Sequence, residues 1–230
     1  MSAAQSAESG ARRFHWEARV AILLSIIAGL VDVTGFLTLG KVFAAHITGN
    51  VVMATAAMFS EVRPAQLIAI PAFVAAVAAT WMLARASGRK GQKLAWLLLT
   101  IQFVLLAAAW VFCAVTQPSS DPHGFLGSIG ALIAVSAMAC QHALLRLALT
   151  SMPSTAVMTG NITTLVLSAL ETRARSEPLM ENAERRLTSS ILILLGFVAG
   201  CLTGTIAVHV LGDGAWAIPA ALAAVTVAIR

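Results

Sequence analysis

Charge is scarce in this chain. Charged residues occupy 11% of the 230 positions and hydrophobic residues 59%, and the mean hydropathy is +0.87. A soluble domain carries roughly 25% charged residues, whereas a membrane-spanning helix needs about 20 mostly apolar residues. The composition therefore excludes an ordinary soluble domain and predicts an all-α integral membrane protein, a polytopic helix bundle.

The sequence also lacks the patterns that mark reactive centres. Cys113, Cys140 and Cys201 have no paired spacing, so we interpret them as inert thiols rather than a disulfide framework or a metal site. The chain contains no Gly-x-Ser-x-Gly, no His-Glu-x-x-His and no pair of carboxylates within one apolar segment. We expect no catalytic residues, no metal site and no cofactor, and hence no enzyme.

Long apolar segments divide the chain. Residues 1–19 are predicted to form a polar cytoplasmic tail and residues 20–230 a single integral membrane domain. Two apolar segments, about 41–60 and 150–170, are interrupted by glycine and asparagine, so each is either a full span or a broken, re-entrant element. Six other segments are long enough to cross a bilayer, although the last is short: about 20–39, 66–84, 94–116, 127–147, 188–208 and 214–229.

The distribution of positive charge discriminates between six and eight spans. With six spans and a cytoplasmic N-terminus, every Lys and Arg except Lys41 and Arg63 lies on the cytoplasmic side. With eight spans, Lys41, Arg146 and the loop 85–93 all lie on the opposite side, so that fewer cationic residues are cytoplasmic. Cytoplasmic loops carry an excess of Lys and Arg, so six spans fit better. The net charge of +5 is thus a topology signal, and no nucleic-acid partner is expected.

The chain carries an internal repeat. Thr48-Gly49-Asn50 recurs 111 residues later as Thr159-Gly160-Asn161, and Phe73-Val74-Ala75 recurs 124 residues later as Phe197-Val198-Ala199. The halves are about 20–116 and 127–229. Three crossings in the first half place the second half upside down, so we predict an inverted repeat. Secondary transporters often have this architecture, with a site between the repeats, although other membrane proteins can also arise by duplication.

The two Thr-Gly-Asn copies are candidate site residues. Thr and Asn side chains can cap the free amides at a helix start, and Gly lets the backbone break or approach closely. If the copies open half-helices at Val51–Phe59 and Ile162–Leu170, two helix N-termini converge and favour an anion. The alternative is that both motifs make only tight contacts between helices.

Asp32 is the only acidic residue well inside a predicted span. A carboxylate at the bilayer centre costs about 2.5–3.5 kcal/mol on insertion scales, so Asp32 is either a proton- or cation-binding group or a structural hydrogen-bonding group. His46 precedes the first Thr-Gly-Asn copy, where Val157 stands in the second, and is either titratable or an interfacial residue. Arg146 is expected to extend to the membrane surface or to pair with Asp32.

Small residues repeat at every fourth position near the end of the chain. Gly196, Gly200 and Gly204 share one helix face, and such faces let helix backbones approach closely in lipid. We predict packing within one chain, with a seam between two copies as the alternative.

These motifs resemble those of a known family. The runs Gly29–Asp32 and Gly40–Asn50, the second Thr-Gly-Asn copy and the segment 196–200 are similar to the YoaK-like family of bacterial membrane proteins, domain-of-unknown-function family 1275. The resemblance covers nearly the whole chain beyond residue 18. It implies a bacterial inner-membrane protein of about six spans, and it implies no substrate, reaction or cofactor.

The function that these features favour is a small transporter or permease. Its pathway would be lined by Asp32, His46 and both Thr-Gly-Asn copies, and its partners would be membrane lipid and a small solute or ion. The alternative is a non-catalytic membrane partner or assembly subunit, for which the mixed-charge loop 171–187 offers a surface. Homo-oligomerisation is left open.

Overall fold

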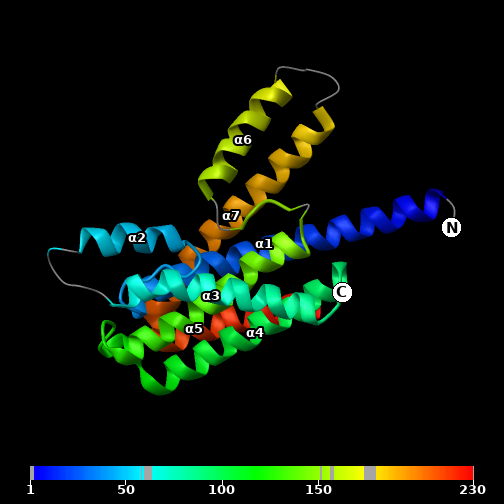
Figure 1. Cartoon of the computed structure of the whole chain (residues 1–230). Helices are drawn as coiled ribbons and strands as arrows, with labels where there is room; N and C mark the ends of the chain where they lie inside the picture. The colour runs from blue at the N-terminus through cyan, green and yellow to red at the C-terminus, as the bar shows by residue number, and fades with distance from the viewer. Residues whose placement is uncertain are drawn as a thin grey trace.

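The regular structure is helical throughout the described part of the chain. The computed structural model describes residues 3–57, 59, 64–150, 152–155, 158–173 and 180–229, and its elements in those ranges are all α-helices or 3₁₀ turns. The all-α prediction is confirmed. The elements are α1 (Ala3–Thr38), α2 (Ile47–Ala56), α3 (Pro64–Ala86), α4 (Gly91–Thr116), η1 (Pro118–Ser120), α5 (Phe125–Leu147), α6 (Met158–Arg173), α7 (Met180–Leu211), η2 (Gly212–Trp216) and α8 (Ala217–Ala228). Figure 1 labels α1 to α7, and α8 is the red helix that leads to the C-terminus.

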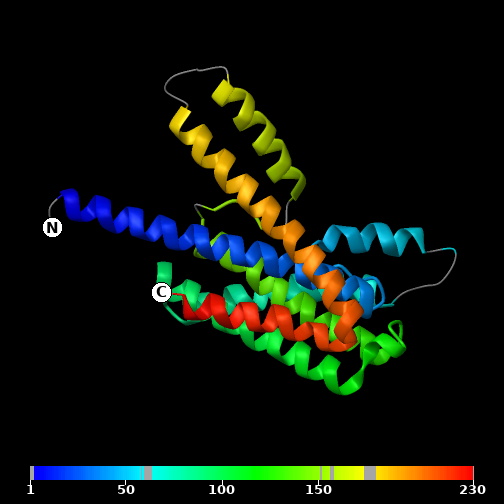
Figure 2. The same ribbon diagram turned by 180° about the vertical axis from the view of Figure 1, so that it is seen from behind.

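Five segments of the described chain are long and apolar enough to cross a membrane: Trp16–Thr38, Ala65–Ala86, Gly91–Thr116, Phe125–Leu147 and Leu187–Ala228. The fifth comprises α8, η2 and most of α7, and the chain turns back at η2 (Figure 2). The full span expected at 214–229 is therefore corrected to α8, whose 12 residues extend only about 18 Å.

The expected N-terminal tail is not a separate segment. α1 is continuous from Ala3 to Thr38, so residues 3–19 extend the first span as helix. At the other end of α1 the backbone reverses through Gly40 and Lys41, both with positive φ. The buried Gln66 side chain of α3 donates from Nε2 to the Lys41 carbonyl oxygen at 3.1 Å and so fixes this turn.

α1 packs most extensively on α7, and glycine makes the close approach possible. A Cβ added at Gly200 would overlap the carbonyl oxygen of Ile26, and one at Gly29 would overlap that of Phe197. Added Cβ atoms at Gly196 and Gly204 would lie 3.3 Å from the carbonyl oxygens of α1 that face them. The glycine face therefore lies between two helices of one chain.

The helix pairs follow the repeat. In the repeat, α1, α2, α3 and α4 correspond to α5, α6, α7 and α8. The contact of α1 with α7 therefore corresponds to that of α5 with α3, the contact of α2 with α3 to that of α6 with α7, and the contact of α4 with α5 to that of α8 with α1. The corresponding helices α4 and α8 also pack on each other. In Figure 1 the members of each related pair run in opposite directions: α1 and α5, α3 and α7, α4 and α8.

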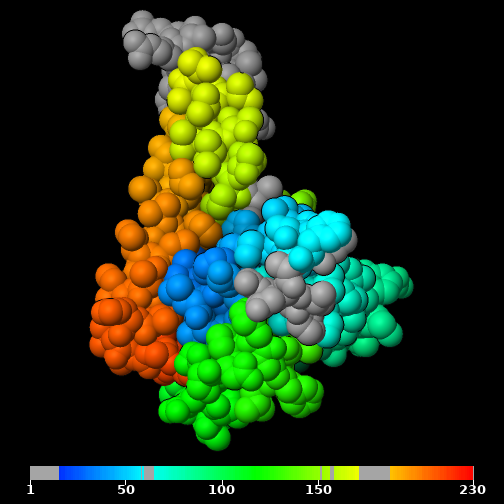
Figure 3. Space-filling view, turned by 90° about the vertical axis from the view of Figure 1, so that its left-hand side faces the viewer, coloured from blue at the N-terminus to red at the C-terminus, as the bar shows by residue number. Residues whose placement is uncertain are grey.

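One helical hairpin projects from the bundle. α6 packs mainly on the N-terminal part of α7, and together they extend away from the other helices (Figure 3). Beneath this hairpin the core is closely packed by fully buried side chains of α1, α4 and α5, including Leu24, Ile27, Leu98, Leu106, Met138 and Leu144.

Candidate functional site

The two short helices start at equivalent positions. α2 begins at Ile47 and α6 at Met158, which are separated by the repeat offset of 111 residues. Each Thr-Gly-Asn copy therefore occupies the first turn of its helix instead of preceding it. This corrects the expected half-helices, Val51–Phe59 and Ile162–Leu170, which were placed four residues too late.

The asparagine of each copy holds the loop that leads into its own helix. Asn50 Nδ2 donates to the Phe43 carbonyl oxygen at 2.6 Å, and the Phe43 amide donates back to Asn50 Oδ1 at 2.8 Å. Asn161 Nδ2 donates to the Ser154 carbonyl oxygen at 2.7 Å. Ser154 is 111 residues after Phe43, so the same clamp occurs in both halves. Asn50 is fully buried and Asn161 nearly so.

These clamps replace the predicted helix caps. The residue before α2, His46, makes no side-chain capping bond, and the Asn50 side chain points back toward the loop. Gly49 serves close packing, because a Cβ there would lie 2.9 Å from Cδ2 of Phe43. Gly160 is exposed in the first turn of α6. Thr48 and Thr159 occupy matching places one residue earlier.

Asp32 holds the first of these loops through two contacts. Its Oδ1 accepts from the Ala45 amide at 2.6 Å, and its Oδ2 contacts Nδ1 of His46. The Asp32 side chain is almost completely buried, whereas that of His46 is 29% exposed. Asp32 thus pairs with His46 and not with Arg146, which corrects the alternative that Arg146 neutralises it.

A second histidine lies near the first. His142 of α5 donates from Nδ1 to the Met138 carbonyl oxygen at 2.8 Å. Because a carbonyl only accepts, the proton on that nitrogen is fixed and Nε2 remains available. The imidazoles of both histidines contact a phenylalanine edge to face: His46 with Phe197 at 5.2 Å between centroids, and His142 with Phe73 at 5.3 Å. These phenylalanines are the two copies matched by the 124-residue offset.

A cavity of about 340 Å³ joins the two halves. Its wall contains residues of the first turns of both short helices, together with both histidines and Phe73. The lining residues are Ala45, His46, Ile47, Thr48, Phe73, His142, Met158 and Thr159. Of the predicted site residues, the structure thus brings His46, Thr48 and Thr159 into one cavity, with Asp32 directly behind His46. Asn50, Asn161 and Gly49 support this wall rather than line it, and Gly160 is exposed.

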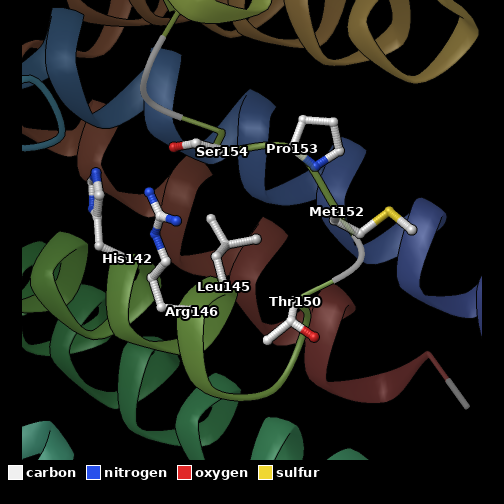
Figure 4. Close-up of a pocket in the computed structure, with 7 residues that line it drawn as sticks. All are labelled: His142, Leu145, Arg146, Thr150, Met152, Pro153 and Ser154. Atoms are coloured by element: carbon white, nitrogen blue, oxygen red, sulfur yellow. The ribbon is translucent and has the colours of Figure 1, made fainter. Parts of the chain in front are cut away.

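Figure 4 shows the residues around a second cavity, of about 390 Å³, which His142 also lines. His142 and Arg146 project from α5 toward the loop that carries Met152, Pro153 and Ser154. Leu145 and Thr150 complete the lining. Since His142 lines both cavities, they are neighbours.

Two glutamines that are not among the predicted site residues form a buried chain of hydrogen bonds. Gln102 Nε2 donates to Gln141 Oε1 at 2.7 Å, and Gln141 Nε2 donates to the Leu24 carbonyl oxygen and to Thr155 Oγ1, each at 2.9 Å. Gln141 therefore anchors the loop before α6, as Asp32 anchors the loop before α2. An uncharged polar residue inside a predicted span was the available signal.

No group of three or more His, Cys, Asp or Glu side chains among the described residues is placed to hold a metal ion. The three cysteines are free thiols, with Cys113 and Cys140 buried and Cys201 half-buried. The chemistry that the arrangement offers is hydrogen bonding, proton transfer through imidazole, and electrostatic attraction.

Comparison with known proteins gives one match. The model of a family described as protein of unknown function (DUF1275) matches residues 20–229. No curated protein and no solved structure matches the chain.

Proposed function

The chain belongs to the DUF1275 family of proteins of unknown function, and we propose that it is a small permease of a bacterial inner membrane. Its transport site is the cavity between His46 and His142. The single observation that carries this proposal is that the first turns of both short helices line one cavity. Such a site between repeat halves is where inverted-repeat transporters bind their solutes.

Three structural features support an inverted repeat. Equivalent helices pair in the same way in both halves, and the members of related pairs run antiparallel (Figure 1). The short helices begin at the same offset, and both are clamped by an asparagine seven residues after the bonded carbonyl. A common ancestral unit accounts for all three features together. The clamps also show how non-helical backbone inside such a bundle satisfies its hydrogen bonds.

The chemistry of the cavity suits a permease better than an enzyme. Asp32 and His46 form an acid–base pair in which the carboxylate is buried and the partly exposed imidazole lines the cavity. A pair of this kind can bind or release a proton as a solute passes. The other polar lining groups, the hydroxyls of Thr48 and Thr159, suit transient hydrogen bonding. We propose transport without covalent catalysis and without a resident metal.

The arrangement of charge supports a cytoplasmic N-terminus, with the α3–α4 connection on the same side as in the six-span interpretation. The cationic residues of the α3–α4 connection, Arg85, Arg89, Lys90 and Lys93, lie at the end of the bundle from which α1 enters (Figure 1). Lys41 follows the opposite end of α1. The positive end is expected to face the cytoplasm.

Labelling of single cysteines tests this topology. In a version with Cys113, Cys140 and Cys201 replaced by alanine, Lys90→Cys should resist a membrane-impermeant thiol reagent added to intact cells. Ser120→Cys, which is exposed at the opposite end of α4, should react. Reaction of Lys90→Cys from outside would reverse the orientation, and equal reaction at both positions would rule out α4 as a span.

Flux into proteoliposomes tests transport itself. Purified protein should move at least one small solute or ion under an imposed gradient, and Asp32→Asn should slow it about tenfold, the effect of roughly 1.4 kcal/mol. His209→Gln is the matched control, because His209 is exposed on α7 and does not line the cavity. Absence of any flux, together with an unchanged cellular phenotype for Asp32→Asn, would end the proposal.

The projecting hairpin favours a second candidate, a membrane assembly subunit. α6 exposes Leu167 and Leu170 and packs mainly on α7 (Figure 3). This role predicts a stoichiometric protein that co-purifies with the chain and is lost when residues 173–186 are deleted. Residues 174–179 of that segment lie outside the described residues. A permease that retains its flux after the same deletion would exclude the assembly role.

A further inference from the structure

We infer that the second cavity, between α5 and the loop that precedes α6, binds a small organic anion. Resting on the proposed permease function, we also infer that this anion is the transported solute. The argument begins with Arg146, which lies in the last turn of α5 and lines the cavity. Its guanidinium points toward the opposite loop in Figure 4.

The lining residues give the cavity a positive character. Arg146 presents up to five N–H donors in a planar fork that matches a carboxylate or a phosphate. Thr150 adds a hydroxyl group, and His142 adds an imidazole ring. None of the described lining residues is acidic. The nearest buried acid, Asp32, already contacts His46 and the Ala45 amide. A cation would therefore meet Arg146 without a compensating carboxylate.

The apolar part of the wall selects an organic ion over a bare one. Leu145, Met152 and Pro153 contribute hydrocarbon to the cavity. Its volume of about 390 Å³ falls within the range of small-molecule sites, roughly 300–1,000 Å³. A ligand with an anionic head and an apolar body satisfies both kinds of surface.

The site is held in shape before any ligand arrives. The loop is fixed at two adjacent residues: the Ser154 carbonyl oxygen accepts from Asn161, and Thr155 Oγ1 accepts from Gln141. Its start is closed by a bond from the Met152 amide to the Leu149 carbonyl oxygen at 3.1 Å. A preorganised wall lowers the cost of ordering on binding.

The anion site adjoins the proposed transport cavity through His142. Because His142 lines both spaces, an anion held by Arg146 would lie in the cavity next to the one lined by His46, Thr48 and Thr159. In this proposal the arginine-lined cavity is the vestibule of the cavity between the repeats.

Binding to delipidated, detergent-purified full-length protein tests the inference, with benzoate as the probe and inorganic phosphate for comparison. We expect saturable benzoate binding by calorimetry, tighter than that of phosphate. Arg146→Gln should weaken it about 10- to 100-fold, the range expected for one charged hydrogen-bonding group. Arg146→Lys should retain part of the affinity, because the charge remains without the fork. Arg85→Gln is the matched control, since Arg85 also lies in the last turn of a helix but outside the cavity.

A second arm identifies the source of the anion. The protein is reconstituted in vesicles of phosphatidylcholine with or without phosphatidylglycerol, and retained lipid is counted after extraction. Phosphatidylglycerol that is retained in stoichiometric amounts, lost in Arg146→Gln and displaced by benzoate would assign the site to a lipid headgroup. Benzoate binding without selective lipid retention would assign it to a free solute.

The results separate the two proposals. Benzoate binding that depends on Arg146, without flux of any anion, supports the site and removes the permease. Flux of cations or neutral solutes without anion binding keeps the permease and overturns the anion site. Equal benzoate affinity in Arg146→Gln, Arg85→Gln and the parent protein, with chromatographic profiles showing that all are folded, also overturns it.

Discussion

The two halves of the molecule share one framework and differ in the groups that it carries. In both halves an asparagine in the first turn of a short helix binds a carbonyl seven residues earlier. In both halves, a polar side chain of a long helix also anchors the loop that precedes the short helix. That side chain is Asp32 in the first half and Gln141 in the second. A neutral amide is thus sufficient to anchor the loop of the second half, and the charge of Asp32 is the difference that the proposed permease would use.

The largest contrast is expected at the helix crossings. Gly200 of α7 lies against the Ile26 carbonyl, whereas its counterpart in α3, Ala76, already carries a Cβ and is half-buried. Gly200→Leu should abolish the folded protein, because backbone must move. Ala76→Leu should cost about 1–3 kcal/mol, as overpacking usually does. Chromatography of solubilised protein measures both, and equal yields would show that the crossings are equivalent.

The two asparagine clamps differ in number of bonds. Asn50 makes two hydrogen bonds to Phe43 and Asn161 makes one to Ser154. Asn50→Ala should therefore lower the free energy of unfolding by about 2–3 kcal/mol and Asn161→Ala by about 1–2 kcal/mol. Thermal unfolding in detergent tests the order, and a larger loss from Asn161→Ala would contradict it.

Substitutions of Asp32 and Gln141 should have opposite effects on flux and on stability. Asp32→Asn keeps an oxygen for the Ala45 amide but removes the charge next to His46, so its stability should change by about 1 kcal/mol or less. Flux should still fall about tenfold. Gln141→Leu should show the reverse, with lower stability because Thr155 and the Leu24 carbonyl lose their donor. A similar flux loss in both variants would indicate that Asp32 acts only as an anchor.

The smallest effect is expected at the two threonines that line the cavity. Thr48→Val and Thr159→Val replace a hydroxyl with a methyl group of similar size at matched positions. Each should lower flux by roughly two- to fivefold, which corresponds to one neutral hydrogen bond of about 0.5–1 kcal/mol. A loss in only one variant would show that the solute contacts a single half.

Much of this architecture is legible in the sequence, and the failures have physical causes. The lengths of the apolar runs predict the long helices, and glycine at every fourth position of 196–204 predicts that α7 approaches another helix closely. The start of α2 was misplaced because an asparagine at a helix start suggests capping, while Asn50 bonds backward to Phe43. The last span was overestimated because hydropathy does not detect the 3₁₀ turn at η2, where Ser119 Oγ donates to Asp213.

The site was predicted only in part for a related reason. The duplicated motif pointed to the correct pair of helices, but spacing along the chain does not specify which partner Asp32 chooses. His46 is 14 residues away in sequence, and the loop between them must fold back for the contact to form. Likewise, Arg146 lines a cavity because residues 152–154 return across α5. Such returns depend on loop conformation, which hydrophobic periodicity does not encode.

The packing of α1 has implications for biogenesis. Its principal neighbours, α7 and α8, are synthesised last, and the Trp16 indole bonds to the Ile229 carbonyl oxygen at 3.2 Å. A newly inserted α1 must therefore remain in lipid with the helix face around Gly29 uncovered while α2 to α6 are translated. We expect quality-control factors that recognise incompletely assembled membrane proteins to bind this uncovered face, and to detect defects in α7 and α8 there first.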